Sequence, residues 1–324
     1  MRRLVVFATT LAIVVAACGD DRDERSSAGA GAEGGSRVSA VAAVYPLAWL
    51  AAQVAPDADV TLLSAGGGQA HDLELSPGQR GAVETAGVVL FVGDIDYQPQ
   101  VEQAVEAARG EVVSLVEVAG PDRLLEAGED DDHGDEQGGG EGDEHADEEG
   151  AVDAHLWFDP EIMSEVAVRT GEAFAAADPD DAETYRENAE AVRVELAALG
   201  EDLEEMLGAD CRHDEAIVSH EAYGYLLSPF GYAQHGVTGI NPEAGASSAE
   251  LGELVDEIEE EGVEHVLTEP VEGREGAETV AREAGIELLE ISPLDAVGDD
   301  DSEAGFPALV RAQAEQFRTA LGCP

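Results

Sequence analysis

Short apolar segments alternate with helix-like segments on both sides of one long helical stretch, and this order limits the fold more than any other feature of the sequence. Before the stretch, the strand-like and helix-like segments are, in chain order, 37–44, 47–54, 59–63, 77–84, 87–92 and 101–108. After it, they are 216–219, 221–227, 248–260, 263–268, 276–284 and 286–291. Such alternation favours parallel sheets with helices packed on their faces.

The long stretch, 160–207, carries apolar side chains on one helical face. These residues are spaced by three and four positions: Val192, Leu196, Leu199, Leu203 and Leu207. The spacing predicts a long helix with one buried face. We therefore expect an α/β fold in which two similar parallel-sheet lobes, 37–158 and 210–324, are joined by a rigid long-helix region at 159–209.

The N-terminus has the layout of a secretory signal peptide, because Arg2 and Arg3 precede an apolar run, 4–17, that ends in small residues directly before Cys18. The run is short for a membrane span, which needs about 20 apolar residues. Its end resembles a bacterial lipobox, so we expect a lipid on Cys18 that anchors the mature protein to the outer face of the cell membrane. The alternative is an ordinary signal peptide that contains a cysteine. The polar segment 19–36 predicts a flexible tether.

The chain is strongly acidic, with a formal net charge of -56. We exclude nucleic acid as a partner, because phosphate backbones require Lys and Arg. The charge fits either a saline habitat or a general affinity for cations and does not decide between them. Within the first lobe, the segment 129–150 consists mainly of Asp, Glu and Gly and includes His133 and His145. It predicts a solvated loop, which is either a weak cation collector or a plain surface loop.

Two cysteines, Cys211 and Cys323, remain once Cys18 is set aside. In an oxidising compartment, an even pair of cysteines predicts a disulfide. The alternative is that both cysteines bind zinc, but neither has a partner at ligand spacing.

Three histidines lie near points where a predicted strand passes into a loop or helix. His71 follows the strand at 59–63, His155 follows the acidic loop, and His220 follows the strand at 216–219. A carboxylate, Asp295, follows the last predicted strand. Because ligands of open α/β sheets bind beyond the carboxyl ends of the strands, this placement indicates a site. Three imidazoles and one oxygen ligand complete the tetrahedron that zinc prefers.

At these residues the chain resembles a known family, the metal-binding lipoproteins of bacterial zinc and manganese ABC importers (cluster A-I solute-binding proteins). The resemblance rests on four segments: 68–77 (GQAHDLELSP), 153–160 (DAHLWFDP), 218–225 (VSHEAYGY) and 294–298 (LDAVG). It implies a monomeric, periplasmic or otherwise extracytoplasmic receptor that captures zinc in the cleft between its lobes. The receptor would then deliver the ion to an ABC permease for import.

The resemblance also implies the roles of individual residues. His71, His155 and His220 correspond to the histidine ligands, and Asp295 to the carboxylate ligand. Ala296 stands where the family usually has proline, which leaves water as an alternative fourth ligand. Manganese members typically carry a carboxylate at the position of His220, so three imidazoles favour zinc over manganese. Glu269 belongs to a segment near the cleft and is a candidate to support a ligand.

Two other functions are alternatives to transport. Three protein ligands and an open fourth position would suit a secreted zinc hydrolase, with Glu74 or Glu221 as the general base. The sequence has no His-Glu-x-x-His pattern and no oxyanion motif beside these residues, so we expect no enzymatic activity. Some relatives in the resembling family are surface adhesins, which makes cell adhesion a candidate secondary role.

Overall fold

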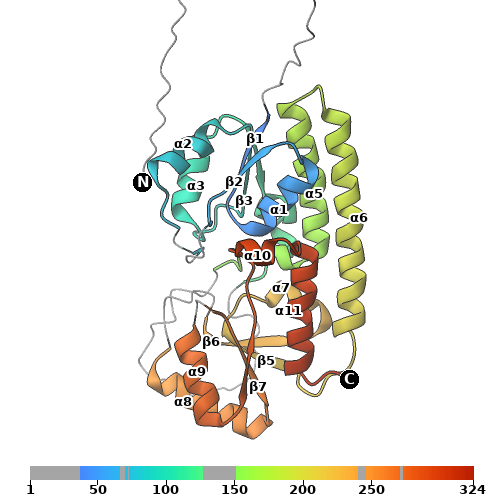
Figure 1. Ribbon diagram of the computed structural model, residues 1–324. Coiled ribbons are helices and arrows are strands. Elements are labelled where there is room, and N and C mark those ends of the chain that lie inside the picture. The colour runs from blue at the N-terminus through green and yellow to red at the C-terminus, as the bar shows by residue number, and fades with distance from the viewer. Residues whose placement is uncertain (1–36, 66–69, 72, 127–150, 240–245, 271–272) are drawn as a thin grey trace, which may run out of the picture. The chain divides into compact units, whose positions relative to one another are not determined.

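The fold is taken from a computed structural model (Figure 1). The structure describes residues 37–65, 70–71, 73–126, 151–239, 246–270 and 273–324. Three predicted features lie outside these residues: the signal peptide with its anchor Cys18, the tether at 19–36 and the acidic loop at 129–150. In the described part of the chain, no helix is both long and apolar enough to cross a membrane.

The first half contains a parallel sheet of four strands in the order β2-β1-β3-β4. Its strands are β1 (Ser39–Ala42), β2 (Asp59–Leu62), β3 (Val88–Phe91) and β4 (Glu111–Ser114). Its helices are α1 (Tyr45–Val54), α2 (Pro77–Thr85), α3 (Pro99–Val105) and α4 (Leu115–Ala119). The central strands β1 and β3 consist largely of buried Ala and Val, as expected where helices cover both faces of a sheet. The three strands predicted in this half are confirmed, whereas β4 was not predicted.

The second half contains another parallel sheet of four strands, in the order β6-β5-β7-β8. Its strands are β5 (Glu215–His220), β6 (Ala233–Thr238), β7 (His265–Thr268) and β8 (Glu287–Glu290). Its helices are α7 (Gly224–Leu227), α8 (Ser248–Glu261), α9 (Arg274–Ala284), α10 (Asp299–Ser302) and α11 (Phe306–Ala320). In both sheets the second strand along the chain is an edge strand, next to the first. The prediction of two similar parallel-sheet halves is confirmed.

The helix predicted at 221–227 begins only at Gly224, so its predicted start was wrong. The preceding residues bond instead to β6 and the residue that follows it. The Glu221 N–H donates to Gly239 O at 3.3 Å, and the Tyr223 N–H donates to Gln234 Oε1 at 2.9 Å. These contacts hold the chain in an irregular conformation directly after β5.

Two helices that lie side by side, α5 (Pro160–Ala177) and α6 (Ala182–Leu207), follow the first sheet (Figure 1). The five apolar positions that predicted a long helix are all buried on α6. A Cβ atom on Gly171 of α5 would lie 2.6 Å from the Ala189 Cβ of α6, so glycine permits the close packing of the pair. Because α6 also packs against α1 and α11, it connects the two halves.

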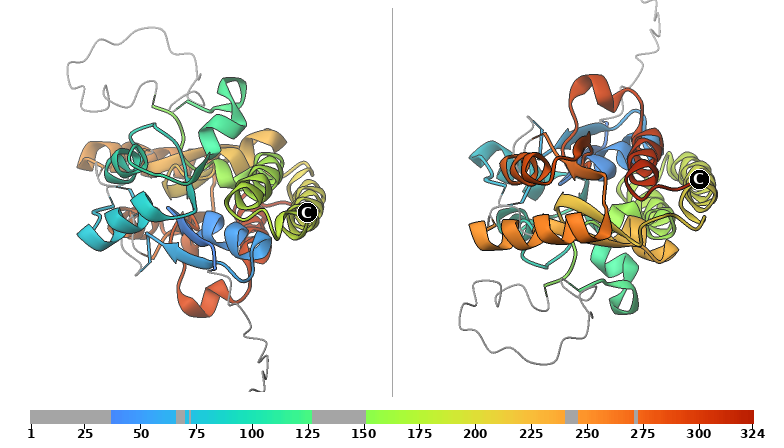
Figure 2. Two further views of the ribbon diagram at one scale, coloured as in Figure 1. Left: turned by 90° about the horizontal axis from the view of Figure 1, so that it is seen from above. Right: turned by 90° about the horizontal axis from the view of Figure 1, so that it is seen from below.

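The C-terminal helix α11 contacts elements of both halves. Its first residue, Phe306, packs against Trp49 of α1 with ring centroids 5.6 Å apart, and Phe317 packs against Tyr223 with centroids 5.0 Å apart. Figure 2 shows α11 beside α6. Buried side chains from both halves thus belong to one shared apolar cluster, and each half also has a smaller cluster of its own. Neither α11 nor β6 was predicted.

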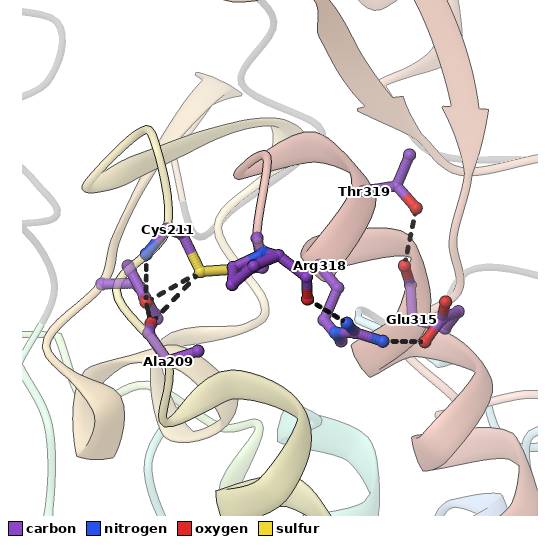
Figure 3. The surroundings of a disulfide bond; sticks show 8 residues. Ala209, Cys211, Glu315, Arg318 and Thr319 are labelled. Atoms are coloured by element: carbon purple, nitrogen blue, oxygen red, sulfur yellow. Dashed lines mark hydrogen bonds and ion pairs between the residues drawn. A yellow bond between two sulfur atoms is a disulfide. The ribbon is translucent and has the colours of Figure 1, made fainter.

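A disulfide joins Cys211, which precedes β5, to Cys323, which follows α11 (Figure 3). This is the pair expected from the sequence. Arg318, on the last turn of α11, donates from Nη2 to Pro324 O at 2.7 Å and from Nη1 to Glu315 Oε2 at 3.1 Å. The disulfide holds the C-terminus beside the segment that precedes β5, and the hydrogen bond from Arg318 to Pro324 holds the last residue against α11.

The double variant Cys211→Ala/Cys323→Ala should be less stable than the oxidised wild type by about 2–5 kcal/mol. The bridge joins residues 112 positions apart, so it restricts a long loop in the unfolded chain. Denaturant titration without reductant measures the free energy of unfolding of both proteins. Wild type titrated with reductant is the matched control and should approach the variant. Equal values for the variant and the oxidised wild type would contradict the expectation.

Candidate metal centre

Three buried histidines lie where segments of both halves meet. His71 belongs to the loop after β2, His155 directly precedes the 3-10 helix η2 (Leu156–Phe158), and His220 is the last residue of β5. The most exposed of them, His71, has 8% of its surface accessible. Residues 68, 69 and 72 of the first histidine loop lie outside the described residues.

Two capped helices fix the loops that carry His71 and His155. The Ser76 hydroxyl accepts a hydrogen bond from the Gln79 N–H at 3.3 Å and begins α2. The Asp159 carboxylate accepts one from the Glu161 N–H at 2.7 Å and begins α5. A proline follows each cap, as is common at the first position of a helix. These caps keep both helices from extending into the histidine loops.

The imidazole rings of the three histidines converge on one point. Each ring offers a nitrogen within 4.8 Å of the nitrogens offered by the other two. The ring centroids lie 5.6 Å apart for His71 and His155, 5.9 Å for His71 and His220, and 5.5 Å for His155 and His220. Nε2 of His71 and Nε2 of His155 are buried without a hydrogen-bond partner among the described residues. The three sequence-predicted histidines are therefore brought together.

A buried carboxylate, Asp153, orients His155. Its Oδ1 lies 2.7 Å from His155 Nδ1 and accepts the His155 backbone N–H at 2.8 Å. A carboxylate at Nδ1 favours the tautomer with the proton on that atom, which leaves the Nε2 lone pair free to bind a metal ion. Asp153 was quoted in the sequence motif but was not assigned a role, although its position two residues before His155 could have suggested one.

Glu269, which follows β7, occupies the equivalent place beside His220. Its Oε1 lies 2.8 Å from His220 Nδ1 and accepts a hydrogen bond from the Tyr223 hydroxyl at 2.9 Å. Burial raises the pKa of the Glu269 carboxyl to about 8, against the opposing effects of the Tyr223 hydrogen bond and of His155. Two of the three imidazoles thus contact carboxyl groups that are almost completely buried.

His71 is held by contacts from the segment before α3. The Gln98 side chain donates to Ala70 O at 2.8 Å, and the Tyr97 ring packs edge-on against the His71 ring with centroids 4.6 Å apart. Burial lowers the pKa of His71 well below its usual value, and His155 and His220 lower it further. The ring is therefore neutral near pH 7, which is the form that binds metal ions.

The ion-free protein should lose stability through His71 on acidification. An exposed imidazole titrates at about pH 6.5. Below this pH the His71 side chain is protonated in the unfolded chain but still neutral in the folded protein, where its pKa is lower. The contribution of His71 is constant above about pH 6.5 and falls below it by up to about 1.4 kcal/mol per pH unit. Unfolding titrations with a chelator, at several pH values, compare wild type with His71→Gln. We expect a steeper acid loss for wild type, and parallel curves would contradict this.

The fourth predicted ligand, Asp295, lies beside the three histidines. Among the described residues, its oxygens do not belong to the group of ligand atoms within 4.8 Å of one another. Its Oδ1 accepts the Ala296 N–H at 2.7 Å, and the Tyr97 hydroxyl lies 3.5 Å from Oδ2. Burial raises the pKa of Asp295 above its usual value. The preceding residue, Leu294, has a φ of 63°, a conformation that costs free energy in a residue other than glycine.

Backbone contacts hold the Asp295 loop against the first half. The Tyr45 N–H and the Ser64 hydroxyl each donate to Asp295 O at 2.9 Å. The indole N–H of Trp157, two residues after His155, donates to Pro293 O at 2.8 Å. Loops from both halves therefore surround the histidines.

The candidate general bases of the hydrolase alternative have other environments. Glu74 is exposed. The Glu221 carboxylate accepts the Gly236 N–H at 3.1 Å, which gives it a structural contact within the second sheet. His213, His235 and His265 are half-buried and do not belong to the histidine group.

Comparison with known proteins identifies the family. Residues 40–320 match the family described as zinc-uptake complex component A, periplasmic (ZnuA). Over 279 residues, the chain is 28% identical to the high-affinity zinc uptake system protein ZnuA of Paracoccus denitrificans. The aligned residues cover 81% of this chain and 84% of that protein. It is 26% identical over 274 residues to the zinc-binding lipoprotein AdcA of Streptococcus pneumoniae, covering 83% of this chain. The chain spans only 52% of the length of AdcA.

Solved structures share the fold. The Zn(II)-bound ZnuA-like domain of Streptococcus pneumoniae AdcA matches with a TM-score of 0.68 at 22% identity, over 88% of this chain and 99% of that domain. The laminin-binding protein Lmb of Streptococcus agalactiae, described as bifunctional with adhesin and metal transporting activity, matches with a TM-score of 0.69 at 23% identity, over 88% and 99%. The family match covers most of the residues that build both sheets and the three histidines. The chain is therefore a member of the zinc-uptake complex component A family.

Proposed function

We propose that this protein is an extracytoplasmic receptor that binds one zinc ion through His71, His155 and His220 and delivers it to an ABC permease. The observation that carries the proposal is the convergence of three buried imidazoles, two of which have an Nε2 atom without a hydrogen-bond partner among the residues that the structure describes. Buried polar atoms normally form hydrogen bonds, so their convergence supports a ligand at this point. Membership in a zinc-uptake family supports the same ligand.

The donor set favours zinc over manganese. Imidazole nitrogen is a good ligand for zinc, whereas manganese prefers carboxylate, carbonyl and water oxygens. The carboxylates of Asp153 and Glu269 lie against the Nδ1 atoms of His155 and His220. They therefore position two imidazoles, as outer carboxyl groups commonly do at metal sites.

The fourth ligand of the proposed site is Asp295, with water as the alternative. Asp295 is buried in the loop next to the histidines, and its carboxylate contacts the Tyr97 hydroxyl and the Ala296 N–H. A small change of its side-chain rotamer would exchange the Tyr97 contact for the ion. If Asp295 keeps its present contacts, water completes the tetrahedron.

The proposed ion would join the two halves. His71 and His155 belong to the first half, while His220 and Asp295 belong to the second. We propose accordingly that the site occupies the cleft between the lobes 37–158 and 210–324 and that the protein acts as a monomer.

The proposed location rests on the sequence before residue 37. The signal peptide and Cys18 predict a lipid anchor on the outer face of the cell membrane, with 19–36 as the tether. The AdcA relative is named a lipoprotein, which supports the same anchor here. Delivery to a permease needs no membrane-spanning segment in the receptor itself.

The other functions have weaker support. The family is one of binding proteins for uptake rather than enzymes, and Glu74 and Glu221 have the environments described above. Adhesion rests on a fold likeness to Lmb at 23% identity, and likeness at that level supports the fold alone.

Metal analysis of the mature protein, purified without added metal, tests the proposed ligand. We expect about one zinc ion and almost no manganese per chain, since three imidazoles converge on one point and are already held by neighbouring side chains. A His213→Ala variant, changed at a histidine outside the site, should retain the zinc. Folded protein that carries manganese, or that takes up no zinc from an equimolar solution, would overturn the proposal.

A further inference from the structure

A second group of potential metal ligands lies in the second half, on three different elements. Glu215 is the first residue of β5, His235 lies on the edge strand β6, and Glu257 lies on α8 (Figure 1). Each offers a ligand atom within 4.8 Å of the atoms offered by the other two. His235 Nδ1 lies 3.3 Å from Glu257 Oε1.

The register of the strands explains why these side chains meet. Ile217 of β5 is paired with His235 of β6. Since side chains alternate between the faces of a strand, Glu215 lies on the same face as Ile217 and His235. This face packs against α8, because Ile217 and Ile258 belong to the same apolar cluster. Glu257 of α8 lies at the edge of the sheet, because its Oε1 is 3.3 Å from Nδ1 of His235 on the edge strand β6.

The surroundings of this group suit a bound cation. The side chains of His235 and Glu257 are 36% and 33% exposed, so they are held by secondary structure yet remain open to water. The carboxylates of Glu215 and Glu257 place negative charge beside the His235 ring, and a divalent cation would neutralise this charge. The sequence of α8, SAELGELVDEIEEE, adds further carboxylates that raise the local concentration of cations.

We propose that Glu215, His235 and Glu257 bind a second divalent transition-metal ion, with zinc as the best-suited ion and water in the remaining positions. One imidazole and two carboxylates are common ligands of zinc. The site is separate from the histidine triad, because Glu215 and His220 are at opposite ends of β5, roughly 16 Å apart at about 3.3 Å per residue. It extends the proposed function, since it adds a weaker, solvent-accessible site to the buried one.

Zinc titration of protein already loaded with one equivalent of zinc tests this site. The measurement is made by calorimetry in about 0.15 M salt, which screens diffuse attraction to the acidic surface. His235→Ala and Glu257→Gln should each weaken the second binding phase by at least about tenfold and leave the first phase unchanged. Glu253→Gln removes the same charge from an exposed position on α8 and is the matched control. It should leave both phases as in wild type.

Three outcomes would overturn the second site. They are a wild type without a second phase, a second phase of wild-type strength in His235→Ala, and equal weakening by Glu253→Gln and Glu257→Gln. The last two would assign the additional zinc to the acidic surface or to the segment 129–150. Loss of the first phase in a triad variant would bear on the proposed function alone, because His71 and His155 contribute nothing to the second group.

Discussion

His71→Ala, His155→Ala and His220→Ala should each weaken zinc binding by more than about 100-fold. Loss of a residue that only orients a ligand already costs about 10–100-fold in affinity, and loss of the ligand itself costs more. Asp153→Asn and Glu269→Gln should therefore fall in this smaller range. Asp295→Ala should have the smallest effect, about tenfold or less, because water can replace an oxygen ligand more readily than an imidazole.

Competition titration against a chelator of known affinity measures all these variants on one scale. His213→Ala is the control for replacing a histidine elsewhere in the fold and should bind zinc as wild type does. Circular dichroism checks that each variant is folded. Wild-type affinity in two of the three triad variants would show that the zinc site lies elsewhere in the chain.

Zinc should raise the thermal stability of the protein by about 10 °C when free zinc exceeds the dissociation constant about 1,000-fold. Binding to the folded state alone then adds about 4 kcal/mol, and each kcal/mol corresponds to about 2–4 °C for a chain of similar size. The unfolded chain does not assemble ligands from distant segments, so it gains little from zinc. The shift should shrink on acidification, when protons compete for the imidazole nitrogens, and for His71 this competition begins only well below its usual pKa.

Differential scanning calorimetry with and without zinc measures this shift. Asp295→Ala should keep most of it, while His155→Ala should lose nearly all of it. A shift of equal size in wild type and His155→Ala would mean that zinc stabilises the protein through another site. Magnesium at the same concentration is the control for general screening of the acidic surface.

Much of the fold was predictable because its central strands are short, apolar and bounded by helix signals. The buried face of α6 followed directly from the spacing of its five apolar residues. The three histidines could be singled out because each lies near a change from strand to loop, and the structure places them together. Parallel sheets make such residues meet even when they are far apart in sequence.

The parts that were not predicted lack a strong periodic signal or depend on distant partners. The strand β4 is an edge strand whose first residues, Glu111 and Val112, are exposed, and β6 interrupts its apolar pattern with His235 and Gly236. The helix α11 did carry a signal, since its buried Phe306, Val310, Ala314 and Phe317 have helical spacing. The role of Asp153 was not predicted, and for Glu269, which the resemblance gave as a candidate to support a ligand, the sequence did not tell which imidazole it contacts.

The packing of α11 links the two ends of the chain during folding. Phe306 packs against Trp49, and the backbone of Asp295 accepts the Tyr45 N–H, so α1 has these neighbours only when the C-terminal segment 295–324 has been synthesised. The first half therefore completes its folding only after synthesis of the whole chain, although it leaves the ribosome first. Since 37–324 form one compact unit, we expect neither half to fold completely when it is expressed alone.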